Sequence, residues 1–233
     1  MKAHWPRRAA GAASCLAALL LLLGATPIRA DEPGHADAPV PVPAPVQVLL
    51  HTQSGDIVIA LDAQHAPLTT ANFLRYVDVK RYDGAAFYRA VQVDDDGNYG
   101  LVQGGLHGSA RPTPKHGPKG SPVKPRKPIP PVAHESPAMT GLRHVDGAVS
   151  MARTAPGTAT SEFFIVLGEL TSLDGKDDDP GYAVFGHVQS GMELVHQMLG
   201  LPRSADAGDG SMRGQLLAEP VKILSARRVS ATD

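Results

Sequence analysis

The sequence predicts a mainly β protein, a barrel of short strands with two capping helices. Two observations favour this class. Most apolar segments are short, rich in β-branched or aromatic residues, and separated by turns that contain Gly or Pro. Only two segments place apolar residues at helical spacing. Many short strands with two helices are typical of a β-barrel with helical caps.

Residues 1–30 have the layout of a secretory signal. A basic start is followed by an uncharged Ala/Leu-rich run, most apolar over residues 15–23, and the segment closes with small residues up to Ala30. We therefore expect cleavage after Ala30 and a periplasmic or secreted protein. Two alternatives stay open. The uncharged stretch 9–28 could act as an uncleaved membrane anchor, and the pair Arg7-Arg8 could direct twin-arginine export.

The composition of the mature chain limits its partners. Cleavage after residue 30 of 233 leaves 203 residues, enough for one domain, and removes the single cysteine, Cys15. Of the 22 Lys and Arg residues four lie in the leader, so 18 remain against 23 Asp and Glu, a net charge of −5. We expect no nucleic-acid partner, no membrane span in the mature form, and a monomer.

Order is expected to begin at residue 46, after a disordered or extended tether over residues 31–45 that is rich in Pro and Ala. The domain then spans residues 46–229. It opens with a hairpin, in which strands over 46–52 and 57–61 are joined by a turn that contains Gly55.

The two expected helices and three further strands follow in order. Ala66-Pro67 sets the start of the first helix, because proline is tolerated in the first turn, and the apolar spacing runs to Val77. The second helix covers residues 191–199. Strands are expected at 163–167, buried on both faces, at 182–188, and at 221–224, which could close the sheet.

A long surface loop is inserted in the domain over residues 106–135. Its central part, residues 111–131, holds eight prolines and six Lys or Arg residues with almost nothing apolar, so it has polyproline character. It is either a solvated spacer or a basic docking loop for acidic clients or anionic lipid headgroups.

The motifs give no support to metal, nucleotide or simple hydrolase chemistry. The histidines of the mature chain are scattered, with no pair at i and i+4. The run 94–98 starts like a calcium loop, but Tyr99 and Gly105 stand where that loop needs Gly and Glu. We expect this run and residues 177–181 to be turns. Neither a nucleophile elbow nor a phosphate-binding glycine motif is present, so we expect no metal and no cofactor.

Three segments carry a resemblance to a known family. They are Phe87-Tyr88-Arg89, then Gln103-Gly104-Gly105, and a run over residues 147–153 continued at 161–165. In order and spacing they resemble the cyclophilins, the β-barrel peptidyl-prolyl cis-trans isomerases. The resemblance implies a closed antiparallel barrel of about eight strands capped by two helices. It also implies a rotamase that assists protein folding and needs no metal, cofactor or nucleophile.

The resemblance further implies the site. Arg89 matches the family's catalytic arginine, and Gln103 matches the glutamine that bonds to the substrate backbone. The substrate-binding residues that it implies are Phe87, Leu101, Ala152, Arg153, Glu162, Phe164, Leu173 and Tyr182. Phe164 would be the floor of the proline pocket. The substrates would be proline-containing unfolded or flexible polypeptides.

The chemistry of the reaction suits an arginine. Rotation about an X-Pro amide faces a resonance barrier of roughly 18–20 kcal/mol, and the prolyl nitrogen regains a lone pair when the amide is twisted. A catalyst therefore needs an apolar pocket for the ring and a donor that binds the twisted amide better than the planar one. Arginine is always charged and presents its donors in a fixed plane.

The chain also departs from the family pattern. Gly100 stands where a pocket phenylalanine is usual, Ser172 where Trp is frequent, and Glu162 and Arg153 replace the usual Gln and Asn. Without an aromatic side chain at position 100, we expect the pocket to bind the proline ring less tightly. Two alternatives to an isomerase that assists the folding of exported proteins therefore stay open. One is a non-catalytic chaperone that binds Pro-peptides on the same fold, and the other is a scaffold that acts through the loop 111–131.

Overall fold

The computed structural model describes residues 45–107 and 129–229. The predicted leader 1–30, almost all of the tether 31–45, most of the loop 106–135 and residues 230–233 lie outside the described residues. Within the described ranges, no helix is both long enough and apolar enough to cross a membrane.

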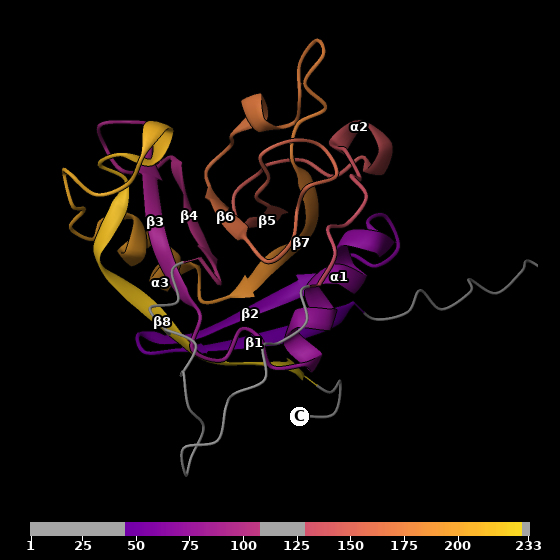
Figure 1. Cartoon of the computed structure of the whole chain (residues 1–233), viewed down its shortest axis with the longest axis horizontal. Helices are drawn as coiled ribbons and strands as arrows, with labels where there is room; N and C mark the ends of the chain where they lie inside the picture. The colour runs from indigo at the N-terminus through magenta and orange to yellow at the C-terminus, as the bar shows by residue number, and fades with distance from the viewer. Residues whose placement is uncertain (1–44, 108–128, 230–233) are drawn as a thin grey trace, which may run out of the picture. The chain divides into compact units, whose positions relative to one another are not determined.

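Eight strands form a closed antiparallel barrel, as the resemblance implies (Figure 1). Their order around the barrel is β1-β2-β7-β5-β6-β4-β3-β8, and β8 returns to pair with β1. The strands are β1 Val46–Thr52, β2 Gly55–Leu61, β3 Ala86–Gln92, β4 Gly100–Gly105, β5 Ala148–Met151, β6 Phe163–Leu167, β7 Ala183–Ser190 and β8 Leu216–Val229.

The strands predicted from the sequence are confirmed. β1 and β2 form the N-terminal hairpin, although β2 begins at Gly55, two residues before the predicted start. The predicted strands at 163–167 and 182–188 are β6 and β7. The segment 221–224 lies within β8, which pairs with both β1 and β3 and so closes the barrel.

Both predicted helices are present, and a third was missed. α1 Pro67–Asp78 has its proline in the first turn, and α3 is Met192–Leu199. The additional helix, α2 Pro137–Thr140, is a single turn that ends at Gly141 in the left-handed conformation, with φ 74°. A helix of one turn is too short to show a periodic apolar pattern, so the sequence gives no signal for it.

The two acidic runs are turns, as predicted. Between β3 and β4, the carboxylate of Asp94 accepts the backbone N–H groups of Asn98 and Tyr99 at 3.0 and 2.9 Å. The run 177–181 lies in a turn closed by pairing of Lys176 with Asp179. Local hydrogen bonds of this kind satisfy the polar groups of a short segment that reverses the chain direction.

Aromatic side chains fill the barrel interior. The ring of Phe163 meets those of Phe73, Tyr82 and Phe87 edge-on at centroid separations of 5.4, 5.6 and 5.6 Å. All four side chains are fully buried. Each such burial stabilises the fold by about 1.5–3 kcal/mol. Since Phe73 belongs to α1, the same cluster holds that helix against the barrel.

β6 is buried on both faces, as its continuous apolar run predicts. Alternate residues Phe163, Ile165 and Leu167 belong to the interior cluster, whereas Phe164 and Val166 belong to a second cluster on the other face of the sheet. We call this second group the outer cluster. It contains Ala148, Phe164, Val166, Leu170 and Val184, with partly buried Leu101, Leu142, Ala152, Leu173 and Tyr182 packed against it.

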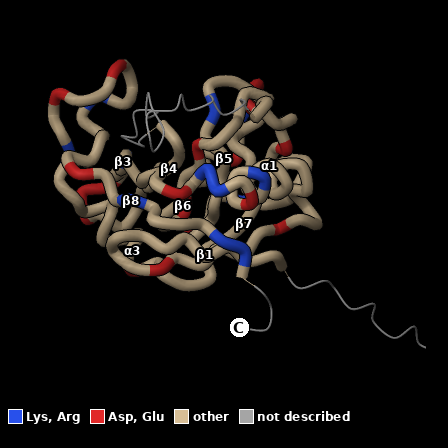
Figure 2. The backbone as a smooth tube through the Cα atoms, turned by 60° about the horizontal axis from the view of Figure 1, so that its bottom comes forward, with Lys and Arg blue, Asp and Glu red and all other residues tan. Residues whose placement is uncertain are grey.

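Two ion pairs fasten β8 to the segment at and after the end of α1. Arg228 bonds to Asp78 and Arg227 to Asp83, each at 2.7 Å. These side chains are partly exposed, so each pair contributes at most about 1 kcal/mol. Figure 2 shows Lys and Arg interspersed with Asp and Glu along the described backbone.

Candidate active site

One row of residues crosses four neighbouring strands. Arg89 on β3 lies opposite Gln103 on β4, Gln103 lies opposite Phe164 on β6, and Phe164 lies opposite Ser150 on β5. Neighbouring strands are about 4.7–4.9 Å apart. The two predicted catalytic residues therefore lie beside the residue predicted as the floor of the proline pocket.

A bulge in β3 turns two consecutive side chains to the same face. Phe87 pairs with Gly104 and Arg89 with Gln103, so Tyr88 is an extra residue opposite β4. Phe87 and Ala90 both belong to the interior cluster. In a regular strand Arg89 would share the inward face with Phe87, whereas the bulge places both Tyr88 and Arg89 outward.

Arg89 is held by two neutral amides. Its Nη1 donates to Oε1 of Gln103 at 2.7 Å, and its Nε and Nη2 donate to Oε1 of Gln215 at 2.9 and 2.6 Å. A guanidinium has five N–H groups, so these bonds leave two for a substrate. No carboxylate in the described part of the chain forms an ion pair with Arg89. Burial lowers the pKa of Arg89, but an arginine stays charged at neutral pH.

A chain of hydrogen bonds continues from Gln103 to Glu162. Nε2 of Gln103 donates to the Tyr88 hydroxyl at 2.6 Å, and that hydroxyl donates to Oε2 of Glu162 at 2.8 Å. Burial, together with the charge of Glu162, raises the pKa of Tyr88 well above its ordinary value. Tyr88 is therefore a neutral O–H donor across the physiological pH range.

The carboxylate of Glu162 is occupied by protein donors. Its Oε1 accepts the backbone N–H groups of Leu106 and His107 at 2.8 and 3.0 Å, and the Ser161 hydroxyl at 2.9 Å. Its Oε2 accepts the Tyr88 hydroxyl. This arrangement differs from the predicted contact with substrate, because both oxygens serve bonds within the protein.

The apolar half of the site is the outer cluster around Phe164. The Tyr182 ring meets the Phe164 ring edge-on at 5.5 Å, and Leu101, Leu173 and Ala152 pack against the same cluster. The N–H of Ala152 donates to the Glu162 carbonyl at 2.9 Å, extending the pairing of β5 with β6. Five of the predicted substrate-binding residues are thus brought together on one face.

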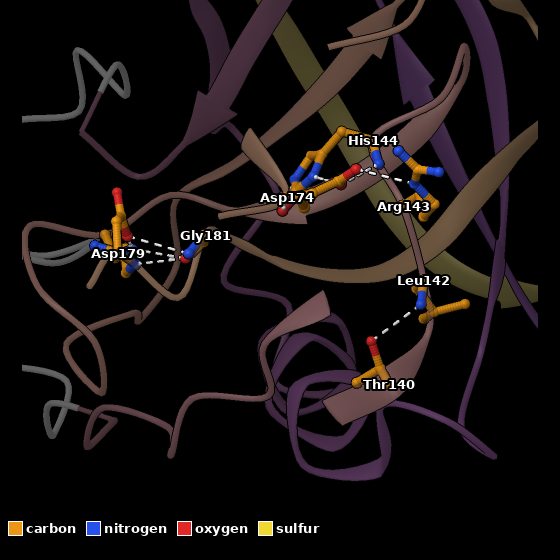
Figure 3. A network of polar contacts seen from close by, with 9 residues as sticks. Thr140, Leu142, Arg143, His144, Asp174, Asp179 and Gly181 are labelled. Atoms are coloured by element: carbon orange, nitrogen blue, oxygen red, sulfur yellow. Dashed lines mark hydrogen bonds and ion pairs between the residues drawn. The ribbon is translucent and has the colours of Figure 1, made fainter. Parts of the chain in front are cut away.

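A buried histidine, His144, stacks against Phe164. The His144 ring stacks on Phe164 at a centroid separation of 5.9 Å and an interplanar angle of 13°. Its Nδ1 lies 2.8 Å from Oδ1 of Asp174, and its Nε2 lies 3.0 Å from the Ser150 hydroxyl. Figure 3 shows Asp174 between His144 and Arg143. Nε of Arg143 donates to Oδ2 of Asp174 at 3.1 Å. Burial lowers the pKa of His144 despite this carboxylate.

Arg153 is committed to the turn 177–181. Its Nη2 donates to Asp179 and to the Gly181 carbonyl, each at 2.6 Å, and its guanidinium lies 4.7 Å from the centroid of the Tyr182 ring. Figure 3 shows Asp179 and Gly181 side by side, and the Gly181 N–H donates to Oδ1 of Asp179 at 3.0 Å. The Arg153 side chain is 8 % exposed. Its guanidinium therefore mainly stabilises the turn beside Tyr182 and is not a free charge for a substrate.

The structure corrects the prediction for Phe87. Its side chain is fully buried in the barrel interior, against Phe163 and next to Gly104. It cannot contact a substrate on the outer face. The bulge explains the error, because Phe87 and Arg89 face opposite sides of the sheet although they are two residues apart.

The structure also explains the glycine at position 100. A side chain there would meet the Val91 carbonyl oxygen and the Leu199 side chain of α3. Position 100 therefore faces α3 and not the outer cluster. The neighbouring Tyr99 is 45 % exposed and lies against Gly168, just beyond β6.

Four residues of the arrangement were not found from the sequence. They are Tyr88, Ser150, His144 and Gln215. Gln215 reaches Arg89 from 126 positions away, because the Ala90 N–H donates to the Gln215 carbonyl at 3.0 Å. Tyr88 and Ser150 lie within the segments that carry the family resemblance. A strand pattern alone, however, does not reveal a bulge or a hydrogen bond between buried side chains.

The described residues contain no group of three or more His, Cys, Asp or Glu side chains that could hold a metal ion. What the arrangement offers is a charged donor with two free N–H groups beside an apolar floor. Such a pair can bind an apolar ring and stabilise charge that develops next to it.

Comparisons with known proteins match one family over most of the chain. The family model described as cyclophilin type peptidyl-prolyl cis-trans isomerase matches residues 47–227. Peptidyl-prolyl cis-trans isomerase A of Dickeya dadantii is 39 % identical over 152 residues, which cover 65 % of this chain and 70 % of that protein. A peptidyl-prolyl cis-trans isomerase of Acinetobacter baylyi is 31 % identical and covers 79 % of this chain and 86 % of its own length.

Solved structures share the fold. A cyclophilin-type isomerase of Cryptosporidium parvum, determined in the presence of the dipeptide Ala-Pro, superposes with a TM-score of 0.56 at 21 % sequence identity. The match covers 79 % of this chain and 99 % of that one.

Proposed function

The chain belongs to the cyclophilin-type peptidyl-prolyl cis-trans isomerase family and to that enzyme class, and we propose that it accelerates X-Pro rotation in exported proteins. It would thereby assist their folding. One observation carries the proposal. A guanidinium with no ion pair among the described residues lies in register beside an apolar floor, since Arg89, Gln103 and Phe164 form one row.

Catalysis is noncovalent in this proposal. The proline ring rests on Phe164, with Leu101 and Leu173 at its sides. One of the two free N–H groups of Arg89 donates to the prolyl nitrogen as the amide twists and the lone pair returns. This bond is stronger in the twisted state than in the planar one, so it lowers the barrier, and each 1.36 kcal/mol removed gives about a tenfold rate.

Gln103 positions the substrate backbone. Its amide nitrogen has two N–H donors, of which one bonds to Tyr88. The second would donate to a substrate backbone carbonyl next to the X-Pro bond. A backbone contact of this kind does not depend on the neighbouring side chains, which fits a broad range of proline-containing, flexible polypeptides as substrates.

The proposed site of action rests on the N-terminal sequence. The basic start, the apolar run and Ala30 support export to the periplasm or beyond, with folding polypeptides there as clients. Mass spectrometry of the protein recovered from the periplasmic fraction should give Asp31 as the first residue. A full-length chain in the membrane fraction would instead favour the retained anchor.

The activity is tested by a protease-free isomerisation assay on residues 31–233 and on Arg89→Ala. The variant should lose at least tenfold in kcat/KM, because removing one donor to a developing charge typically costs about 10²–10³-fold. Arg228→Ala is the matched control and should retain parent activity, since Arg228 bonds to Asp78 and lies at the opposite end of β8 from Leu216, the residue that pairs with Arg89. If neither parent nor variant is active but both bind Pro-peptides, the protein is a binding chaperone.

A further inference from the structure

The hydrogen-bonded chain behind Arg89 has a direction that is set at its two ends. Arg89 can only donate, so it requires the carbonyl oxygen of Gln103 as its acceptor. The Gln103 amide nitrogen then faces Tyr88, whose oxygen must accept. The Tyr88 proton in turn needs an acceptor, and the carboxylate of Glu162 is one. From this order we propose that Tyr88 and Glu162 are positioning residues that fix the amide orientation of Gln103 and thereby the guanidinium of Arg89.

The protein holds the far end of the chain firmly. Oε1 of Glu162 accepts the N–H groups of Leu106 and His107, which follow β4 directly. A side chain at Gly105 would collide with the same carboxylate. The anchor is thus built from backbone, and it leaves Oε2 in place for Tyr88.

At the Arg89 end, the orientation of the guanidinium depends on the orientation of the Gln103 amide, because Arg89 has one other side-chain partner among the described residues. Its other partner is Oε1 of Gln215, again an amide that can turn over. If Gln103 turned over, its amino group would face Nη1 of Arg89, and two donors would oppose each other. Tyr88 prevents this exchange as long as its own proton is held by Glu162.

Glu162→Gln tests the direction of the chain with almost no change of shape. The Gln carbonyl would keep the bonds to Leu106 and His107, which places its amino group against the Tyr88 hydroxyl. The Tyr88 oxygen would then face two N–H donors, one from Gln103 and one from the substituted side chain. The Tyr88 proton would have no acceptor within this series of hydrogen bonds. Either that proton is left unsatisfied or Gln103 turns over, and both weaken the hold on Arg89.

The inference rests on the proposed isomerase function, and the kinetic experiment uses the purified protein. Glu162→Gln and Tyr88→Phe should each lower kcat by about tenfold with KM changed less than about twofold, because Arg89 acts in the transition state. The double variant should be no slower than the worse single variant, since both act through one hydroxyl. Independent, multiplying losses would overturn the proposal, and so would an unchanged kcat in Glu162→Gln.

A matched control separates positioning from lost stability. Tyr82→Phe removes another buried tyrosine hydroxyl, which donates to the Ser161 carbonyl at 3.0 Å and takes no part in the chain. It should lower thermal stability as Tyr88→Phe does but leave kcat within about twofold. An equal loss of kcat in Tyr82→Phe would assign the effect to stability and overturn the proposal.

A spectroscopic readout keeps the inference testable if the parent protein shows no isomerase activity. In ¹⁵N-labelled protein, Glu162→Gln should shift the side-chain amide signals of Gln103 and the Nε–H signal of Arg89. Unchanged signals at both residues would overturn the proposal, whatever the activity. An inactive parent with shifted signals would overturn only the proposed function.

Discussion

His144 is the clearest residue whose role depends on burial. It is fully buried between Asp174 and Ser150 and stacks beneath Phe164. Burial lowers its pKa, so the ring takes up a proton at a lower pH in the folded protein than in the unfolded chain. Burial opposes ionisation of Asp174 as well, but hydrogen bonds from His144 and Arg143 outweigh it and lower the pKa of that carboxyl.

The free energy of unfolding should therefore fall as the pH decreases below about 6.5, the ordinary pKa of histidine. In that range the unfolded chain binds a proton at His144 and the folded protein does not, so protonation favours unfolding. One such group changes stability by at most about 1.4 kcal/mol per pH unit. Urea unfolding at pH 7.5 and 5.5 measures the difference.

His144→Gln supplies the comparison for this prediction. The variant should be less stable but should show a flatter dependence on pH. Some dependence should remain, because burial, with Arg153 nearby, also lowers the pKa of His134. Equal pH dependence in parent and variant would show that His144 does not titrate as its burial implies.

Among the elements, the β3–β4 pair sets the geometry of the candidate site. The bulge at Tyr88 places Arg89 outward, and β4 ends at Gly105 with φ 146°, where Glu162 approaches the backbone. Strand propensity predicts that these segments are strands. It does not predict the bulge, because a bulge is a property of the ladder between two strands and not of one strand.

Gly105→Ala should impair both stability and activity. Alanine disfavours this φ, at a cost of order 1–3 kcal/mol, and its Cβ would displace the carboxylate of Glu162. We expect kcat to fall by about tenfold through the loss of the Tyr88 bond. Urea unfolding and the isomerisation assay measure the two effects.

Gly141→Ala is the control at the same scale. Gly141 also has a positive φ, 74°, but a Cβ there would meet nothing within 4 Å. This variant should lose stability by strain alone, with kcat within about twofold of the parent. Equal loss of activity in both variants would assign the effect of Gly105→Ala to strain and not to Glu162.

At the scale of the whole molecule, barrel closure brings distant segments together. Gln215, just before β8, reaches Arg89 because β8 returns to pair with β3 as well as β1. Pro220 lies where the ladder with β3 is interrupted, between the pairs of Phe87 with Val221 and of Arg89 with Leu216. A proline has no N–H to give to a ladder, so the interruption accommodates it.

Replacing residues 111–128 with a Gly/Ser segment of equal length should leave peptide isomerisation within about twofold of the parent. Every residue that we place in the site lies within residues 45–107 or 129–229, and the loop's basic Pro-rich composition is that of a solvated or docking segment. The assay is run beside a pull-down of client polypeptides. Lost isomerisation would bring the loop into the catalytic domain, whereas lost client binding alone would support the docking alternative.

From the sequence alone the barrel class, the hairpin and two helices could be predicted, and the family resemblance added the expectation that Arg89, Gln103 and Phe164 form the site; the structure places these three residues in one row. Local periodicity, turn residues and motif order carry that information. The tertiary structure was needed to show that Phe87 faces inward, that Gly100 faces α3, and that Tyr88, Glu162 and Gln215 lie around Arg89 and Gln103. The physical reason is that side-chain direction and hydrogen-bond polarity depend on strand register across a closed barrel, where the partner lies far away in the chain.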